Sequence, residues 1–181
     1  IRDYRDRADS ISQLKGLVGE TSGEAVVWGE AVDPIPGIRL VDRTELAKAQ
    51  TLAIWTIPPG PGVIRRALDR VQPEMVALFA VDPGVDTVKQ FLARLYGLVK
   101  YALAHRDGVV RFSRLAACTS HDEKTVQAGL SYLAQRGYIS LSKLGRGRRI
   151  LNSPGEPGSN LQQARKRLQA ELEEAAAYRS Y

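Results

Sequence analysis

The sequence predicts an α/β protein in which a small, mainly parallel sheet domain at residues 1–84 precedes a more helical domain at 85–153. Two observations predict this class. In the first part, short apolar runs rich in Val, Ile and Trp alternate with helical periodicity, which is typical of strands covered on both faces. In the second part, a long helical face, two shorter helices and two strand-like runs follow one another.

The first domain is expected to contain two helices and four strands. Ile11, Leu14 and Leu17 recur at helical spacing and predict a helix near residues 6–18. A second, short helix follows from one apolar stripe over residues 63–71. The strands are expected at residues 25–28, 38–41, 52–57 and 75–81. Strands interleaved with helices favour a Rossmann-like, mainly parallel sheet with right-handed crossovers.

A proline-rich turn, residues 58–62, separates the third of these strands from the second helix. Open α/β sheets usually bind ligands at such a turn, so a phosphate site is one interpretation. The turn has no G-x-G-x-x-G or Gly-Lys-Ser/Thr pattern, and proline offers no N–H to an anion. We therefore expect a rigid structural turn.

The second domain, residues 85–153, opens with its longest helix. Apolar residues at helical spacing predict a helix of about 20 residues that ends near Gly108. A brief strand at 109–112 and a short helix at 113–118 follow, and Ser113 is expected to cap that helix.

The rest of this domain adds a third helix and a ribbon. Ser120 and Glu123 have the spacing of a capping box, which predicts a helix that runs to Arg136. Two strands, residues 138–144 and 148–151, then flank a Gly-Arg-Gly turn. Helix, short strand, helix, turn, helix and two-stranded ribbon is the order of a winged helix, which is the fold that we expect here.

The last segment, residues 154–181, is expected to be a linker and a C-terminal helix. The linker is too rich in Gly, Pro and Ser to bury much. Leucines at helical spacing then predict an amphipathic helix that ends near Tyr178.

The net charge of +6 is distributed unevenly. Residues 1–100 hold 13 Lys or Arg and 13 Asp or Glu, whereas residues 101–181 hold 13 and 7. This asymmetry suggests that one half meets a polyanion, and a solvated basic surface is the alternative. The ribbon and the exposed face of the helix before it carry groups that can meet phosphates and base edges. The expected nucleic-acid-binding residues are Lys124, Gln127, Ser131, Gln135, Lys143, Arg146, Arg148 and Arg149.

No catalytic or metal-binding residue is predicted, and no cofactor is expected in this chain. His105 and His121 form no His-x-x-x-His pair and lie near no carboxylate cluster, so we expect structural roles at helix ends. Cys118 has no indicated partner base and is expected to be a small buried residue. Use of the winged helix for packing or protein contacts is the alternative to nucleic-acid binding.

Bulk features favour a cytoplasmic protein with no membrane partner. No apolar run is long enough to span a membrane, and no signal-peptide pattern occurs. A single cysteine cannot form an internal disulfide. Because the chain begins with Ile1 and its only methionine is Met75, we expect it to be a piece of a longer protein.

Four stretches carry a resemblance to a known family. They are Ile1-Arg2-Asp3-Tyr4-Arg5, the run Leu-Ala-Ile-Trp-Thr-Ile-Pro-Pro at 52–59, residues 91–101, and Ala-Ala-Ala-Tyr-Arg at 175–179. In this order they resemble the accessory α/β segment and the terminal module of bacterial RecJ, the single-strand-specific 5′ to 3′ DNA exonuclease family. The similarity spans nearly the whole chain in its order of elements.

The resemblance implies an accessory role without catalysis. The family's nuclease chemistry depends on a DHH-type core in which Asp and His bind two divalent metals, and that motif does not occur here. A divalent metal is therefore expected only in the absent core. The implied partners are single-stranded DNA, the acidic tail of single-stranded-DNA-binding protein, and the remainder of the same polypeptide.

Two other functions stay open. A transcriptional regulator would combine an N-terminal α/β ligand-sensing domain with a winged helix that reads duplex DNA, and it would form a two-fold dimer. A small α/β enzyme with an appended helical module is disfavoured because the catalytic groups are missing.

Overall fold

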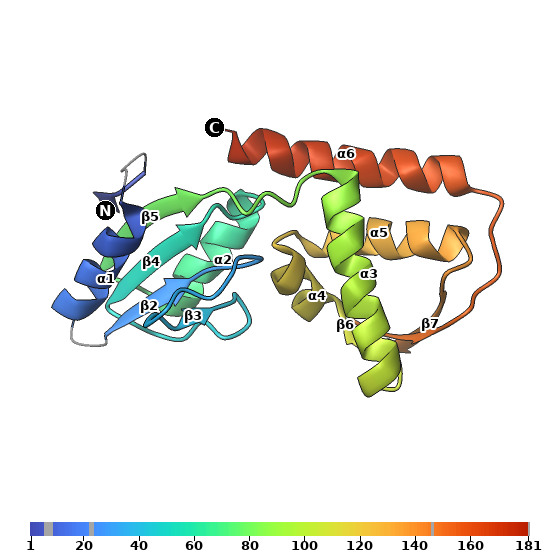
Figure 1. Ribbon diagram of the computed structural model, residues 1–181, viewed down its shortest axis with the longest axis horizontal. Helices are drawn as coiled ribbons and strands as arrows, with labels where there is room; N and C mark the ends of the chain where they lie inside the picture. The colour runs from blue at the N-terminus through green and yellow to red at the C-terminus, as the bar shows by residue number, and fades with distance from the viewer. Residues whose placement is uncertain (6–8, 22–23, 146, 181) are drawn as a thin grey trace. The chain divides into compact units, whose positions relative to one another are not determined.

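The structure, a computed structural model, describes residues 1–5, 9–21, 24–145 and 147–180. The chain divides into two compact units, Ile1–Pro83 and Gly84–Tyr181 (Figure 1). The first unit holds a five-stranded parallel sheet, and the second holds a small antiparallel sheet and the C-terminal helix. The predicted α/β class and mainly parallel sheet are therefore confirmed. Within these ranges, none of the helices combines the length and apolar character needed to cross a membrane.

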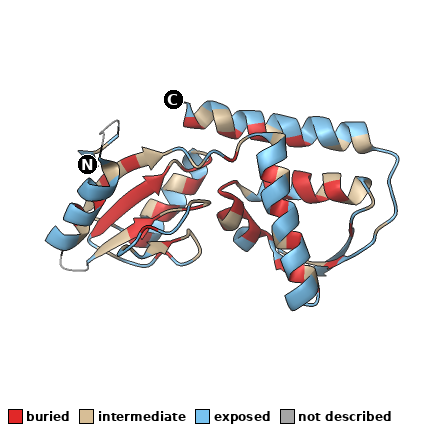
Figure 2. Cartoon of the chain, in the orientation of Figure 1, coloured by how far each residue is buried: buried red, intermediate tan, exposed pale blue. Residues whose placement is uncertain are grey.

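Every strand pair of the first unit is parallel, in the order β1-β5-β4-β2-β3. The strands are β1 (Arg2–Asp3), β2 (Ala25–Trp28), β3 (Leu40–Val41), β4 (Thr51–Thr56) and β5 (Met75–Val81). All six residues of the central strand β4 are buried, as an uninterrupted apolar run predicts (Figure 2). The sequence did not predict β1, because two charged residues form no apolar run; it pairs with Ala77 and Leu78 at the sheet edge.

Two helices cover opposite faces of this sheet. The first, α1 (Ser10–Glu20), buries its leucines in a core cluster that includes Trp55. The second, α2 (Pro61–Val71), buries its valines in another cluster that includes Trp28. Because successive residues of a strand point to opposite faces, β4 contributes to both clusters.

The second unit contains its elements in the predicted order and close to the predicted bounds. They are α3 (Val88–His105), β6 (Val109–Arg111), α4 (Phe112–Thr119), α5 (Glu123–Gln135), β7 (Ser140–Gly145), β8 (Arg148–Asn152) and α6 (Leu161–Arg179). The three strands form an antiparallel sheet in the order β6-β8-β7. The central strand β8 therefore joins the ribbon to the short strand that precedes α4.

The helices of this unit pack around one apolar core, in which α3 and α5 approach closely. Phe91 and Leu95 of α3 are fully buried there. A Cβ on Gly129 of α5 would lie 2.6 Å from Leu95 Cδ2 and 2.6 Å from Phe91 Cε1. Glycine normally weakens a helix interior, and this contact explains its presence in α5.

Both predicted caps in this unit are wrong. α4 begins one residue before Ser113, with Arg111 at the N-cap and no side-chain cap. α5 is capped by Asp122, whose Oδ1 accepts hydrogen bonds from the Thr125 N–H at 2.8 Å and the Thr125 hydroxyl at 2.9 Å. Ser120 instead ends α4 in the left-handed conformation, with φ of 54°, so it lies outside the following helix.

The segment that precedes α6 is fixed against α5. Gly158 donates a backbone hydrogen bond to the Gln135 carbonyl at 3.0 Å. α6 then runs back along α5 (Figure 1), and its Leu168 and Leu172 are buried in the core shared with α3 and α5. Residues 154–181 thus complete the second unit, where the sequence suggested an appended linker and helix.

A buried polar cluster fixes the far end of α6. Arg179 forms an ion pair with Asp86 and donates hydrogen bonds to the carbonyl and the hydroxyl of Ser120, the latter at 3.0 Å. Nε2 of His121 lies 3.0 Å from Oδ1 of Asp86, and its Nδ1 lies 2.7 Å from the Thr119 carbonyl oxygen. The cluster ties the start of the unit and the α4–α5 junction to the last helix.

Candidate nucleic-acid interface

Three of the predicted residues lie along one face of α5. Lys124 and Gln127 are exposed, and Ser131 is half-buried one turn later. Their spacing of three and four residues places them on one side of the helix, while Leu130 and Leu133 enter the core. This face carries a single cation, so its electrostatic attraction to phosphate is small.

Gln135, the fourth predicted residue of α5, serves the loop before α6. Its Oε1 accepts a hydrogen bond from the Asn160 N–H at 2.9 Å. A Cβ on Gly158 would lie 2.0 Å from the same Oε1, so the loop packs tightly on this side chain. Gln135 is therefore half-buried and bonded to the loop, whereas Lys124 and Gln127 are exposed.

The predicted cations of the ribbon lie on both of its faces. β8 pairs with β7 so that Arg149 is opposite Lys143 and Arg148 is opposite Gly145. Because neighbouring residues of a strand point to opposite faces, Arg148 faces away from Arg149 and Lys143. Arg146, the fourth predicted cation, lies outside the residues that the structure describes.

Another cation, Arg111 of β6, lies directly opposite Arg148. The two residues are partners in an antiparallel pair, so their side chains leave the sheet on the same face. Lys143 and Arg149 are paired in the same way on the other face. Like charges directly opposite one another destabilise a strand pair. β8 therefore meets a like charge at both of its cationic positions.

No described carboxylate forms an ion pair with Arg111 or Arg148, although Arg179 of the same unit does have such a partner. Arg149 has other partners, since its guanidinium carbon lies 4.8 Å from the ring centre of Phe112 and its Nη1 donates to the Arg148 carbonyl at 2.9 Å. What distinguishes Arg111 and Arg148 is that they face each other directly across two paired strands.

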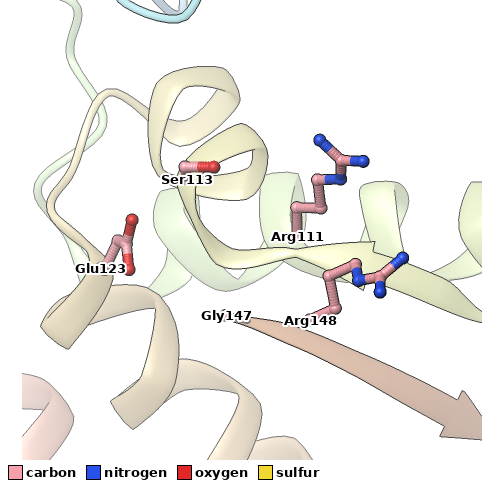
Figure 3. A pocket seen from close by; sticks show the side chains of 5 residues that line it. All are labelled: Arg111, Ser113, Glu123, Gly147 and Arg148. Atoms are coloured by element: carbon pink, nitrogen blue, oxygen red, sulfur yellow. The ribbon is translucent and has the colours of Figure 1, made fainter. Parts of the chain in front are cut away.

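A hollow of about 570 Å³ opens beside this pair (Figure 3). Ser113, Glu123 and Gly147 line it together with the two arginines. Figure 3 shows Arg111 and Arg148 extending from neighbouring strands, with their guanidinium groups directed away from Ser113 and Glu123. The two guanidinium groups and the hydroxyl suit the oxygens of a phosphate group, whereas the carboxylate of Glu123 repels it.

The cationic excess belongs to the second unit as a whole. Residues 84–181 carry 16 Lys or Arg and 8 Asp or Glu, a net charge of +8. Residues 1–83 carry 10 and 12, a net charge of −2. The positive field of the chain therefore arises in the unit that holds the Arg111–Arg148 pair.

Sequence reasoning missed Arg111 and Ser113 as site residues. The strand at 109–112 was expected, but its pairing partner was not considered. A strand of three residues is stable only when it pairs with another, and the ribbon offered the nearest predicted strands in that half. That requirement is the signal that could have placed Arg111 beside the ribbon cations.

No group of three His, Cys, Asp or Glu side chains that could hold a metal ion occurs within the described ranges. His105 lies in the last turn of α3, with its ring centre 4.8 Å from that of Tyr101. His121 is fully buried in the cluster with Asp86. Cys118 is half-buried at the end of α4.

In the first unit, the protein's own side chains occupy the place where open α/β sheets bind ligands. The chain leaves β2 toward β3 and leaves β4 toward β5, so the strand order reverses between β2 and β4. Glu30, just after β2, is 3% exposed and accepts hydrogen bonds from the Trp28 indole at 2.9 Å and from Arg43 Nε at 2.8 Å. Its N–H donates to the Thr56 hydroxyl after β4 at 3.0 Å. A carboxylate in this position repels a phosphate.

Comparison of the chain with protein-family models, with curated proteins and with solved structures gives no match in any of the three. The functional proposal therefore rests on the residues of the interface.

Proposed function

We propose that this chain is a non-catalytic accessory region of a RecJ-like 5′ to 3′ single-stranded-DNA exonuclease of DNA repair and recombination. In this proposal the second unit is a winged-helix domain that binds DNA, with β7 and β8 as its wing. The element order from α3 to β8 and the antiparallel β6-β8-β7 sheet support that interpretation. Nuclease chemistry, with its divalent metals, would come from a DHH-type core outside residues 1–181.

The observation that carries the proposal is the pairing of Arg111 with Arg148. Two cations placed opposite each other repel, and no described carboxylate forms an ion pair with either of them. A phosphate group accepts bidentate hydrogen bonds from guanidinium groups, so one phosphate between the two arginines removes the repulsion. The hollow beside the pair provides room for it.

Neighbouring cations support a polymeric anion over a small one. Lys143 and Arg149 lie on the other face of the same ribbon, and Lys124 lies on α5, whose first residue lines the hollow. Several phosphates of one strand can therefore be neutralised together, which releases counterions and makes the affinity depend on salt.

Charge reversal of the pair tests this proposal. The double variant Arg111→Glu/Arg148→Glu should bind a single-stranded oligonucleotide about a hundredfold more weakly, because two charge-assisted contacts are lost. Two contacts fewer should also flatten the slope of log K against log salt by about 1.4, at about 0.7 per phosphate. Fluorescence anisotropy of a labelled oligonucleotide at several salt concentrations measures both quantities.

A matched control keeps the change in net charge and moves it to α6. Arg165 and Arg167 are exposed on that helix, and Arg165→Glu/Arg167→Glu makes the same change in charge. This control should lose much less affinity than the double variant of the pair. Equal losses in the two variants would mean that only the net charge matters, and no loss in either would remove DNA binding from the unit.

Adding other ligands to the binding assay distinguishes the possible partners from one another. An acidic tail peptide of single-stranded-DNA-binding protein competes with the strand if it uses the same arginines. Preference for a palindromic duplex, bound by a two-fold dimer, would favour the transcriptional regulator instead. The full-length open reading frame should encode a DHH-type core if the accessory role is right.

A further inference from the structure

A second hollow, of about 520 Å³, lies among α3, β6 and α4. Apolar side chains line much of it, including Leu98, Val110 and Leu115. Tyr101 of α3 also lines it and is 54% exposed. The cationic side chains around it are Arg106, Arg111, Arg114 and Arg148.

The two hollows share the Arg111–Arg148 pair. Both side chains line the polar hollow beside Ser113, and both line the apolar hollow beside Tyr101. A phosphate held by these two guanidinium groups therefore lies at the edge of an apolar space. The group attached to that phosphate can enter it.

We propose that the apolar hollow accepts one unpaired nucleobase of a DNA strand whose neighbouring phosphate lies on Arg111 and Arg148. The inference rests on the proposed function and adds to it a base-binding subsite. A nucleotide joins one flat, largely apolar ring to one phosphate, which matches an apolar space beside an arginine pair. The exposed ring of Tyr101 and the guanidinium planes around the hollow are groups on which bases stack.

Such a subsite distinguishes a single strand from a duplex. In a duplex the bases are stacked and paired, and moving one out costs a few kcal/mol. In a single strand the base enters the hollow without that cost. The phosphate contacts alone do not discriminate in this way, so the preference for single strands is assigned to the apolar hollow.

Removal of the Tyr101 ring tests the subsite. Tyr101→Ala should lower the affinity for a short oligothymidine about tenfold and the affinity for a duplex of equal length less than about twofold. Tyr96→Ala is the matched control, because Tyr96 lies on the same helix, is 37% exposed and packs near Tyr138 outside the hollow. Equal effects of Tyr101→Ala on both substrates would overturn the inference.

Cys118 supplies a direct measure of occupancy in the unmodified chain. It is the only cysteine of the sequence and it lines the apolar hollow. Bound oligothymidine should slow its reaction with a thiol alkylating reagent by up to about fivefold when the site is about 80% occupied. An abasic strand of equal length, which keeps the phosphates and lacks the bases, should bind and leave the reaction rate unchanged.

The outcomes separate the subsite from the proposed function. If the abasic strand protects Cys118 as well as oligothymidine does, the base subsite is overturned and phosphate binding is retained. Protection by an acidic peptide and not by oligothymidine would make the hollow a peptide site and overturn the inference. Failure of the chain to bind either strand would remove the proposed function as well.

Discussion

Arginines are used in opposite ways in the two units. In the first unit Arg43 is paired with the buried carboxylate of Glu30, and backbone and side-chain donors complete the site. In the second unit Arg111 faces Arg148, and no described carboxylate joins them. Folding favours the first arrangement, because a buried charge is costly unless it is paired. The second lowers stability, and in the function that we propose a bound phosphate offsets this cost.

This contrast does not arise from a lack of acids in the second unit. Asp86 is present there and is paired with Arg179 and His121. Glu123 lines the hollow beside Arg111 and Arg148 without forming an ion pair with either of them. In this unit Arg179 thus holds the fold together, whereas we propose that Arg111 and Arg148 bind a partner. The following variants test that division.

The largest expected effect is on the buried pair of the first unit. Arg43→Ala leaves Glu30 buried without its cation and should lower the free energy of unfolding by about 3–5 kcal/mol. Urea denaturation followed by Trp fluorescence measures it, since Trp28 donates to the same carboxylate. Arg39→Ala, at an exposed position shortly before β3, is the control and should cost less than about 0.5 kcal/mol. A loss below about 1 kcal/mol for Arg43→Ala would contradict the structural role.

A smaller effect is expected where β6 meets β8. Gly108 has φ of +69°, and a Cβ there would lie 2.1 Å from the Leu151 carbonyl oxygen. Gly108→Ala should therefore destabilise the second unit by about 3 kcal/mol and separate Arg111 from Arg148. Gly145→Ala separates the effect of the left-handed backbone from that of the close contact. Gly145 has φ of +78°, but nothing lies within 4 Å of an added Cβ, so this substitution should cost only about 1 kcal/mol. Thermal unfolding of both variants makes the comparison, and equal shifts would mean that the close contact is unimportant.

The paired arginine of the second unit should give a loss of intermediate size. Arg179→Met removes the ion pair with Asp86 and the hydrogen bonds to Ser120, so α6 loses its anchor. We expect a loss of about 2 kcal/mol, less than for Arg43, because Asp86 keeps its contact with His121 and is 16% exposed. Hydrogen exchange should report faster opening of the last turns of α6. Unchanged protection there would show that core leucines alone hold the helix.

The sequence indicated the elements of both units because their signals are local. The buried run at 51–56 and the helical stripe at 88–105 each show their period within one segment. The caps of α4 and α5 were misplaced because Ser113 and Ser120 are good capping residues by type, while the backbone at 120 is left-handed. Type alone does not reveal that conformation.

Only part of the candidate site could be predicted from the sequence, because the rest depends on strand pairing between distant residues. The ribbon cations are close in sequence, so Lys143, Arg148 and Arg149 could be found by counting charges. Arg111 lies 37 positions before Arg148 in the sequence, and only the β6–β8 register brings the two residues opposite each other. Register follows from packing over long distances along the chain, which periodicity does not report. Periodicity likewise does not report that Gln135 accepts a hydrogen bond from the loop before α6.

The smallest expected effect is a gain in stability, whereas the variants above lose stability. It distinguishes arginines that stabilise the fold from arginines that we propose bind phosphate. Arg111→Thr removes one of two repelling charges and adds a residue that favours strands, so the second unit should gain about 0.5 kcal/mol of stability. Arg148→Thr should do the same, and the double variant should gain little more than either one, because the repulsion is lost with the first substitution. Urea denaturation gives this double-mutant cycle, and anisotropy with oligothymidine should show weakened binding in all three variants. A stability loss of about 1 kcal/mol in either single variant would place that arginine with Arg43 and Arg179, as a residue kept for folding.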